Sequence, residues 1–195
     1  MFYALRMDGR LAIRPMMGSD VDDFVREECA QGWHSEPGKL LSRLEHERAG
    51  KCVTLTTEFE GECAGYVFVY PDSPWGAFGG RGLPEIVDFA VLEKFRGRGI
   101  GSALMDTAEE IAAKFSDTVY LGVGLHAGYG SAQRMYAKRG YIPDAPASGT
   151  GAKSALPIPP ARMTTISSSI SRKNCGRKNG REKLSAVPET NRNSY

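Results

Sequence analysis

The sequence predicts a single α/β (α+β) domain in which helices flank a sheet. Three observations lead to this prediction. A strand, a glycine-rich turn and a helix follow one another over Glu85–Phe115, an apolar hairpin pattern occupies Cys52–Tyr70, and a second strand–helix unit occupies Thr118–Arg139. The length of 195 residues fits one domain with a sizeable core better than two.

The first half of the chain predicts a strand, two helices and a hairpin. Ser19 is a suitable N-cap for the first helix, and the three aspartates that follow suit the helix dipole. The second helix ends at Gly50, and Glu60-Gly61 is a typical hairpin turn. In chain order, the expected elements are a strand at Leu11–Met16, helices at Asp20–Ala30 and Pro37–Ala49, strands at Cys52–Phe59 and Cys63–Tyr70, a strand at Glu85–Val91, a helix at Ile100–Phe115, a strand at Thr118–Val123 and a helix at Gly130–Arg139.

The turn Arg96–Gly101, with the sequence RGRGIG, predicts a pyrophosphate cradle. Its three glycines let backbone N–H groups approach a ligand, and the first N–H groups of the following helix lack partners within the helix. The helix dipole and two arginines add positive charge. The alternative is a tight turn whose glycines serve packing alone. The dinucleotide pattern G-x-G-x-x-G fails at Ser102, and no P-loop pattern occurs in the chain.

Arg96, Gly99 and Gly101 match the pattern [Q/R]-x-x-G-x-[G/A], which resembles the GNAT superfamily of N-acetyltransferases. The preceding VDFAVLEKF looks like that family's fourth strand, and Ser131–Asp144 resembles its next helix and the turn that follows. The resemblance covers about residues 10–144. It implies a GNAT domain over 1–144, with a central mixed, mostly antiparallel sheet, a parallel and splayed pair of fourth and fifth strands, and flanking helices.

The resemblance implies transfer of the acetyl group of acetyl-CoA to a primary amine of a small molecule or peptide. Many members carry an asparagine where this chain has Tyr129, and the backbone amides of the next two residues are expected to serve instead. The expected cofactor-binding residues are Phe89, Ala90 and Val91 along the pantetheine, Arg96, Gly97, Arg98, Gly99, Ile100, Gly101 and Ser102 around the pyrophosphate, and Gly130 and Ser131. The alternative is a non-catalytic or defective relative that binds acyl-CoA.

Acetyl transfer needs a base that removes a proton from the attacking amine and an acid that protonates the leaving CoA thiolate. Tyr136 matches the family position that often supplies the acid, with a buried structural tyrosine as the alternative. Glu85 and Asp88 are candidate bases, and in a straight strand they point to opposite faces unless a bulge intervenes. His126 is a third candidate because its intrinsic pKa is suitable. For each of these three, the alternative is a solvated or structural residue.

The remaining composition favours a cytoplasmic enzyme without a metal. The four cysteines form no C-x-x-C pair, the histidines lack metal-ligand spacing, and no apolar run reaches the length of a membrane span. Residues 1–144 have a net charge of −5, so the domain itself is not expected to bind nucleic acid. A homodimer is compatible with the sequence. The family's acceptor-binding loops here hold Trp33, His34, Trp75, Phe78 and Arg81.

Residues 145–195 carry nine basic and two acidic residues and are rich in Ser, Pro and Asn, a composition typical of disorder. We therefore expect a basic, largely irregular tail where the family has two closing strands. One hypothesis is a frameshift, because another reading of the codons from Pro157 onward permits an acidic turn, an apolar strand and a basic end. In that case Thr118–Val123 would lack a partner on its outer edge. The alternative is a genuine basic tail that binds an acidic partner.

Overall fold

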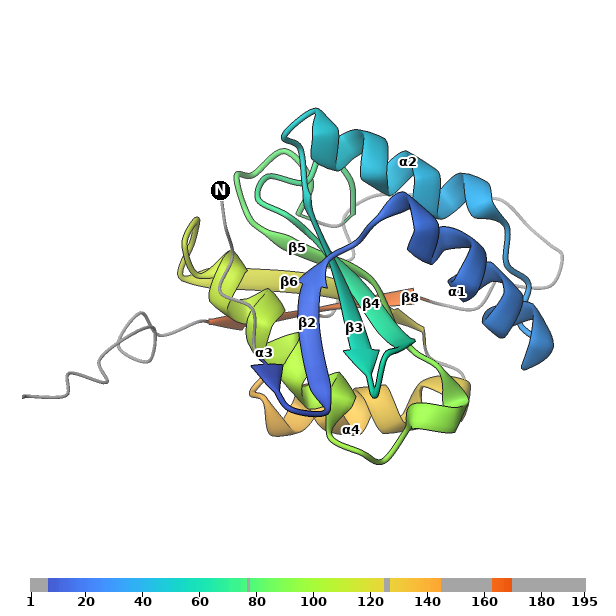
Figure 1. Cartoon of the computed structure of the whole chain (residues 1–195). Coiled ribbons are helices and arrows are strands. Elements are labelled where there is room, and N and C mark those ends of the chain that lie inside the picture. The colour runs from blue at the N-terminus through green and yellow to red at the C-terminus, as the bar shows by residue number, and fades with distance from the viewer. Residues whose placement is uncertain (1–6, 77, 125–126, 145–162, 170–195) are drawn as a thin grey trace, which may run out of the picture.

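The computed structural model describes residues 7–76, 78–124, 127–144 and 163–169. These form one sheet with four α-helices (Figure 1). The elements are β1 (Met7–Asp8), β2 (Leu11–Pro15), α1 (Gly18–Ala30), α2 (Pro37–Arg48), β3 (Val53–Phe59), β4 (Glu62–Tyr70), β5 (Glu85–Val91), α3 (Ile100–Ala112), β6 (Thr118–Gly124), α4 (Gly130–Lys138), β7 (Ile142–Asp144) and β8 (Met163–Ser169), with short 3-10 turns at Glu93–Phe95 and Ala127–Tyr129.

The strand order is β1-β2-β3-β4-β5-β6-β8-β7, and every neighbouring pair is antiparallel except β5–β6. The parallel pair is registered only at Glu85↔Tyr120 and Ile86↔Leu121, after which the two strands separate. The predicted fold class, a mixed and mostly antiparallel sheet with one splayed parallel pair, is therefore confirmed.

The two faces of the sheet pack against different helices (Figure 1). Along β4, Val67 and Val69 face the core formed with α3 and α4, whereas Tyr66, Phe68 and Tyr70 face the core formed with α1 and α2. This alternation follows from the two-residue period of a strand. It puts the hydroxyl groups of Tyr66 and Tyr70 on the α1–α2 side, where they form hydrogen bonds with side chains of these two helices.

The start of α1 differs from the expectation that Ser19 is the N-cap. The helix begins at Gly18, and the Asp20 carboxylate accepts a hydrogen bond from the backbone N–H of Met17 at 2.7 Å. The same carboxylate binds the Arg14 guanidinium of β2 at 2.7 Å. Asp20 is thus at position N3 of the helix, with Met17 as the N-cap, and its carboxylate binds the Met17 backbone and the nearby Arg14 together.

A bulge in β5 decides where its carboxylates point. The register between β4 and β5 shifts in mid-strand, so that Asp88 and Phe89 together face one residue of β4. Asp88 has a φ of 53°, in the left-handed region. In a straight strand Glu85 and Asp88 would face opposite sides. The bulge instead puts Asp88 against Arg43 of α2, whose charge also acts on Glu85.

The outer edge of β6 is covered, which corrects the expectation of an open edge. All seven residues of β6 pair with Met163–Ser169, and β8 pairs in turn with β7. A ladder uses main-chain groups that every non-proline residue carries, and this segment contains no proline, so it can pair despite its weak apolar alternation. Residues 145–162 and 170–195 lie outside the described residues. The irregular tail, the frameshift hypothesis and the domain boundary at 144 stay predictions.

Candidate functional site

The turn before α3 presents backbone amides to open space. Gly97 and Gly99 have φ values of 76° and 80°, and a Cβ at either position would meet no atom within 4 Å. The first helical hydrogen bond runs from the amide of Ala103 to the carbonyl of Gly99, so the preceding amides of α3 have no acceptor within the helix. This geometry, together with the helix dipole, makes the turn suitable for a diphosphate group.

A cavity of about 740 Å³ extends from this turn across the opening between β5 and the α1–α2 linker. Ten of the twelve predicted cofactor-binding residues line it: Phe89, Ala90, Val91, Arg96, Gly97, Gly99, Ile100, Gly101, Ser102 and Ser131. Gly130 and Arg98 do not belong to this lining. The Arg98 guanidinium instead lies over the rings of Phe59 and Phe95, at 5.3 and 5.9 Å from their centroids.

The α1–α2 linker forms a wall of the cavity. The backbone amide of Trp33 donates to the carbonyl of Glu28 at 2.9 Å, which turns the chain back after α1. Trp33 and His34 both line the cavity, and the Arg96 guanidinium lies 5.5 Å from the centroid of a Trp33 ring. Of the predicted acceptor-loop residues, these two therefore reach the cavity.

The other three acceptor-loop candidates lie outside the cavity lining. Trp75 stacks on His46 of α2, with ring centroids 5.9 Å apart. Phe78 packs on Tyr120, and the Arg81 guanidinium lies over the Phe78 ring. These contacts hold the loop before β5 against α2 and β6.

The two β5 carboxylates have different surroundings. Asp88 lines the cavity and forms an ion pair with Arg43 of α2, with 2.9 Å between Oδ2 and Nε. Glu85 is not part of the cavity lining and accepts hydrogen bonds from the hydroxyls of Ser73 and Tyr120. Burial raises the pKa of the Glu85 carboxyl above its ordinary value, while these two hydrogen bonds act in the opposite direction.

Tyr136 lies in the core beside the cavity. Its side chain is 5% exposed and packs against Phe89 and Tyr141, with ring centroids 6.3 and 5.6 Å away. Burial raises the pKa of its hydroxyl well above the usual tyrosine range. Tyr136 is not among the described residues that line the cavity. His126 lies outside the described residues.

Sequence reasoning missed three residues at the α1–α2 end of the cavity: Glu28, Lys39 and Tyr66. A signal for Glu28 was present, because it follows Val21 and Phe24 at i+7 and i+4, on the buried stripe of α1. A carboxylate in an apolar stripe indicates a polar partner inside the fold. Tyr66 is that partner, but it comes from β4 and cannot be found from local spacing.

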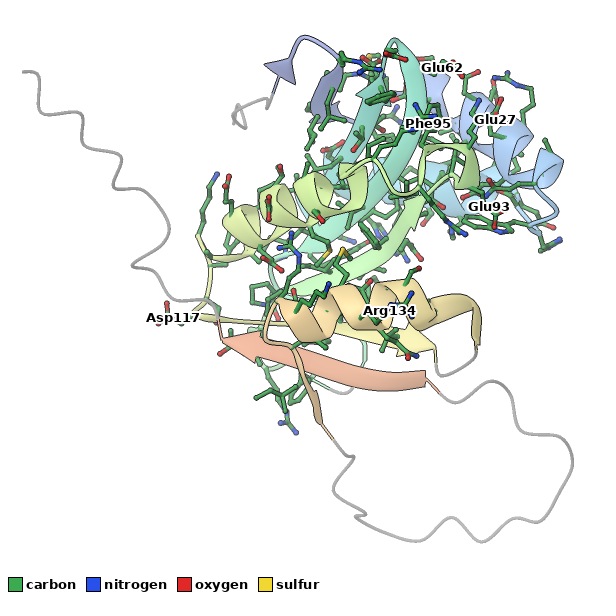
Figure 2. The ribbon with its side chains drawn as sticks, turned by 90° about the horizontal axis from the view of Figure 1, so that it is seen from below. Glu27, Glu62, Glu93, Phe95, Asp117 and Arg134 are labelled. Atoms are coloured by element: carbon green, nitrogen blue, oxygen red, sulfur yellow. The ribbon has the colours of Figure 1, made fainter. Side chains whose placement is uncertain are left out.

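A second groove of about 510 Å³ continues the cavity between α3 and α4 and shares Ser102, Ser131 and Met135 with it. Figure 2 shows Arg134 on α4, and both Arg134 and Lys138 line this groove. Arg139, also in the lining, ties the two helices together through ion pairs with Asp106 and Glu109 of α3. The groove adds exposed positive charge next to the glycine-rich turn.

Within the residues that the structure describes, no group of three or more His, Cys, Asp or Glu side chains could hold a metal ion. The helices described are all too short or too polar to cross a membrane.

Comparison with known proteins identifies the family. A family model described as the Acetyltransferase (GNAT) family matches residues 19–141, well over half of the chain. No curated protein sequence matches significantly.

Solved structures show the same fold. The yncA protein of Salmonella typhimurium, solved with its cofactor acetyl-CoA, has a TM-score of 0.61 at 16% identity, over 84% of this chain and 95% of that one. An N-acetyltransferase from Staphylococcus aureus has a TM-score of 0.62 at 14% identity, over 84% of this chain and 100% of that one. A ribosomal-protein-alanine N-acetyltransferase from Brucella melitensis has a TM-score of 0.58 at 19% identity, over 81% of this chain and 99% of that one. The sheet with its splayed parallel pair, the glycine-rich turn before α3 and the matching family model agree: this chain belongs to the GNAT acetyltransferase family.

Proposed function

We propose that this protein transfers the acetyl group of acetyl-CoA to a primary amine of a small molecule or peptide. The observation that carries the proposal is the turn before α3, where two left-handed glycines leave open space beside helix-end amides at one end of a large cavity. The glycine-rich motif of this turn, which is typical of the family, is suited to binding a diphosphate group. Bound acetyl-CoA would supply the acetyl thioester.

The chain's own residues fit such a ligand. The amides of Gly97–Ser102 would hold the pyrophosphate, and Arg96 adds a positive charge at the cavity wall. Phe89, Ala90 and Val91 line the cavity where β5 has separated from β6, so their free edge can face the pantetheine. Gly130 and Ser131, at the start of α4, supply a second helix N-terminus, and Arg134 and Lys138 lie in the adjoining groove.

For the base, we propose a β5 carboxylate. Asp88 lines the cavity and can meet the acceptor directly, and its ion pair with Arg43 holds the carboxylate in place. Burial raises the pKa of the Glu85 carboxyl, a shift in the direction that suits a base, but Glu85 is not part of the cavity lining. Asp88 is therefore the first candidate. Glu85 and His126 are the others.

For the acid, we propose Tyr136, whose raised pKa keeps its hydroxyl protonated. Its burial behind Phe89 favours the second candidate function, a GNAT relative that binds acyl-CoA without catalysis. A location in the cytoplasm is proposed because Cys29, Cys52 and Cys63 are free thiols. A homodimer remains part of the proposal and rests on the sequence alone.

Two assays on the full chain test the proposal. Calorimetry measures CoA binding, and release of free CoA thiol from acetyl-CoA is followed with a panel of primary amines and with no amine. The proposed function predicts binding, together with amine-dependent thiol release that matches the acetylated amine mole for mole. Binding without amine-dependent release would support the non-catalytic candidate. Absence of CoA binding would contradict both candidates.

A further inference from the structure

A buried carboxylate lies at the α1–α2 end of the cavity, apart from the proposed base and acid. Glu28 lines the cavity with only 3% of its surface exposed. Its two oxygens accept hydrogen bonds from the hydroxyls of Tyr66 and Ser35, at 2.7 and 2.5 Å. Both donors are neutral, and within the described residues no basic side chain forms an ion pair with Glu28. A buried carboxylate without a cation is costly, so this part of the cavity is suited to a positively charged ligand.

Lys39 of α2 shows that the same place accommodates an ammonium group. Its Nζ lies 3.4 Å from the Tyr66 hydroxyl, 5.6 Å from the centroid of the Tyr66 ring and 4.0 Å from the Asp88 carboxylate. These distances are long for direct ionic contacts, and the Lys39 side chain is half exposed. The protein's own ammonium therefore lies loosely at the border of the cavity, while Glu28 lies deeper.

We infer that Glu28, together with Tyr66 and Asp88, forms the subsite that binds the acceptor as an alkylammonium ion. The inference rests on the proposed acetyltransferase function and names its acceptor class: aliphatic primary amines, which are protonated near neutral pH, rather than aryl amines or acidic acceptors. Glu28 acts here as a specificity-determining residue. An ammonium can donate to its carboxylate and lie against the Tyr66 ring, the two kinds of contact that proteins use for such groups.

The test uses the complex of the full chain with CoA and two matched variants. Glu28→Gln keeps the side-chain shape and an oxygen acceptor for Tyr66 but removes the charge. Glu27→Gln is the control, because its carboxylate comes from the same helix turn and pairs with Lys94 at 2.8 Å outside the cavity lining. Figure 2 shows Glu27 gathered with Glu62 and Phe95 around that side of the molecule. The probes are n-butylamine, which is cationic at pH 7.5, and aniline, which is neutral.

Glu28→Gln is expected to weaken butylammonium binding by about 10- to 100-fold, the loss typical of a hydrogen bond between charged groups. Glu27→Gln should match the wild type, and the weak binding of aniline should be the same in all three proteins. Lys39→Met should strengthen butylammonium binding, because it removes a competing cation. CoA affinity should stay unchanged throughout.

Three results would overturn the inference. The first is butylammonium binding by Glu28→Gln within twofold of the wild type. The second is a wild-type CoA complex that does not bind butylammonium. The third is weaker binding in Lys39→Met, which would show that Lys39 does not compete with the ammonium probe for this place. All three leave CoA binding and amine-dependent thiol release intact, whereas failure of the proposed function would appear as a wild-type chain that binds CoA without amine-dependent thiol release or that does not bind CoA at all.

Discussion

Replacing Gly99 by valine should abolish CoA binding while most molecules stay folded. Gly99 has a φ of 80° and empty space where a Cβ would lie, at the point where the ligand is proposed to approach the α3 amides. A non-glycine residue in the left-handed region costs about 1–2 kcal/mol. A cost of that size lowers the melting temperature of a chain this long by about 2–8 °C.

The structure offers a control for this strain. Gly140 has a φ of 84° and likewise meets no atom within 4 Å of its ideal Cβ, but it follows α4 and does not line the cavity. Gly140→Val should therefore lose similar stability and keep its CoA affinity. Gly99→Val should in addition lose contacts between amides and pyrophosphate. Two charge-assisted hydrogen bonds at about 1.5–3 kcal/mol each correspond to a loss of about 10²- to 10⁴-fold in affinity.

The assay is isothermal calorimetry with CoA at a temperature where thermal denaturation shows both variants to be folded. Wild-type CoA affinity in folded Gly99→Val would refute the placement of the pyrophosphate. Equal loss in both variants would mean that strain, and not blocked approach, causes the effect.

Four further predictions concern the catalytic candidates and the sheet. Tyr136→Phe keeps the packing and removes the hydroxyl, so turnover should fall by about 10²- to 10⁴-fold with unchanged CoA binding; turnover within a few-fold of the wild type would show that Tyr136 is structural. Asp88→Asn should lower turnover by about 10²- to 10⁴-fold with unchanged CoA binding, and turnover within a few-fold of the wild type would move the base role to Glu85 or His126. The raised pKa of Glu85 gives the folded protein a stabilising contribution that is complete below the ordinary value of 4.5 and is lost as pH rises through the folded pKa. The urea midpoint of Glu85→Gln should therefore fall less between pH 4.5 and 7 than that of the wild type, and identical pH dependence would contradict this. In hydrogen exchange, the amides of Met163–Ser169 should be protected together with those of Thr118–Gly124, whereas full exchange of the former within seconds would restore the open edge.

The glycine-rich turn and most of its surroundings could be predicted because their determinants are local. Glycines, an N-terminal helix turn and apolar spacing lie within about twenty residues of sequence, and ten of the twelve predicted cofactor residues line one cavity. Arg98 was predicted to bind the cofactor but does not line the cavity. Its guanidinium lies over the rings of Phe59 and Phe95, whose positions cannot be predicted from local sequence.

The remaining features depend on contacts between distant segments. The bulge at Asp88 accompanies a close approach of β4, where a Cβ on Gly65 would lie 2.6 Å from the carbonyl oxygen of Ala90. From the sequence, the two carboxylates of β5 are expected on opposite faces of a straight strand. Whether a bulge changes this depends on how β5 pairs with β4, which local sequence does not show. The partner of β6 was missed for a related reason, because a ladder of main-chain groups leaves little pattern in Met163–Ser169.

The central claim is that the α3 turn and the cavity beside β5 bind acetyl-CoA for transfer to an amine. A crystal structure of the full chain with CoA tests it most directly. We expect the pyrophosphate within hydrogen-bonding distance of the amides of Gly97–Ser102 and the pantetheine along Phe89–Val91, with the thiol directed toward Asp88. A pyrophosphate bound elsewhere, or a pantetheine that leaves the cavity beside β5 empty, would contradict the account.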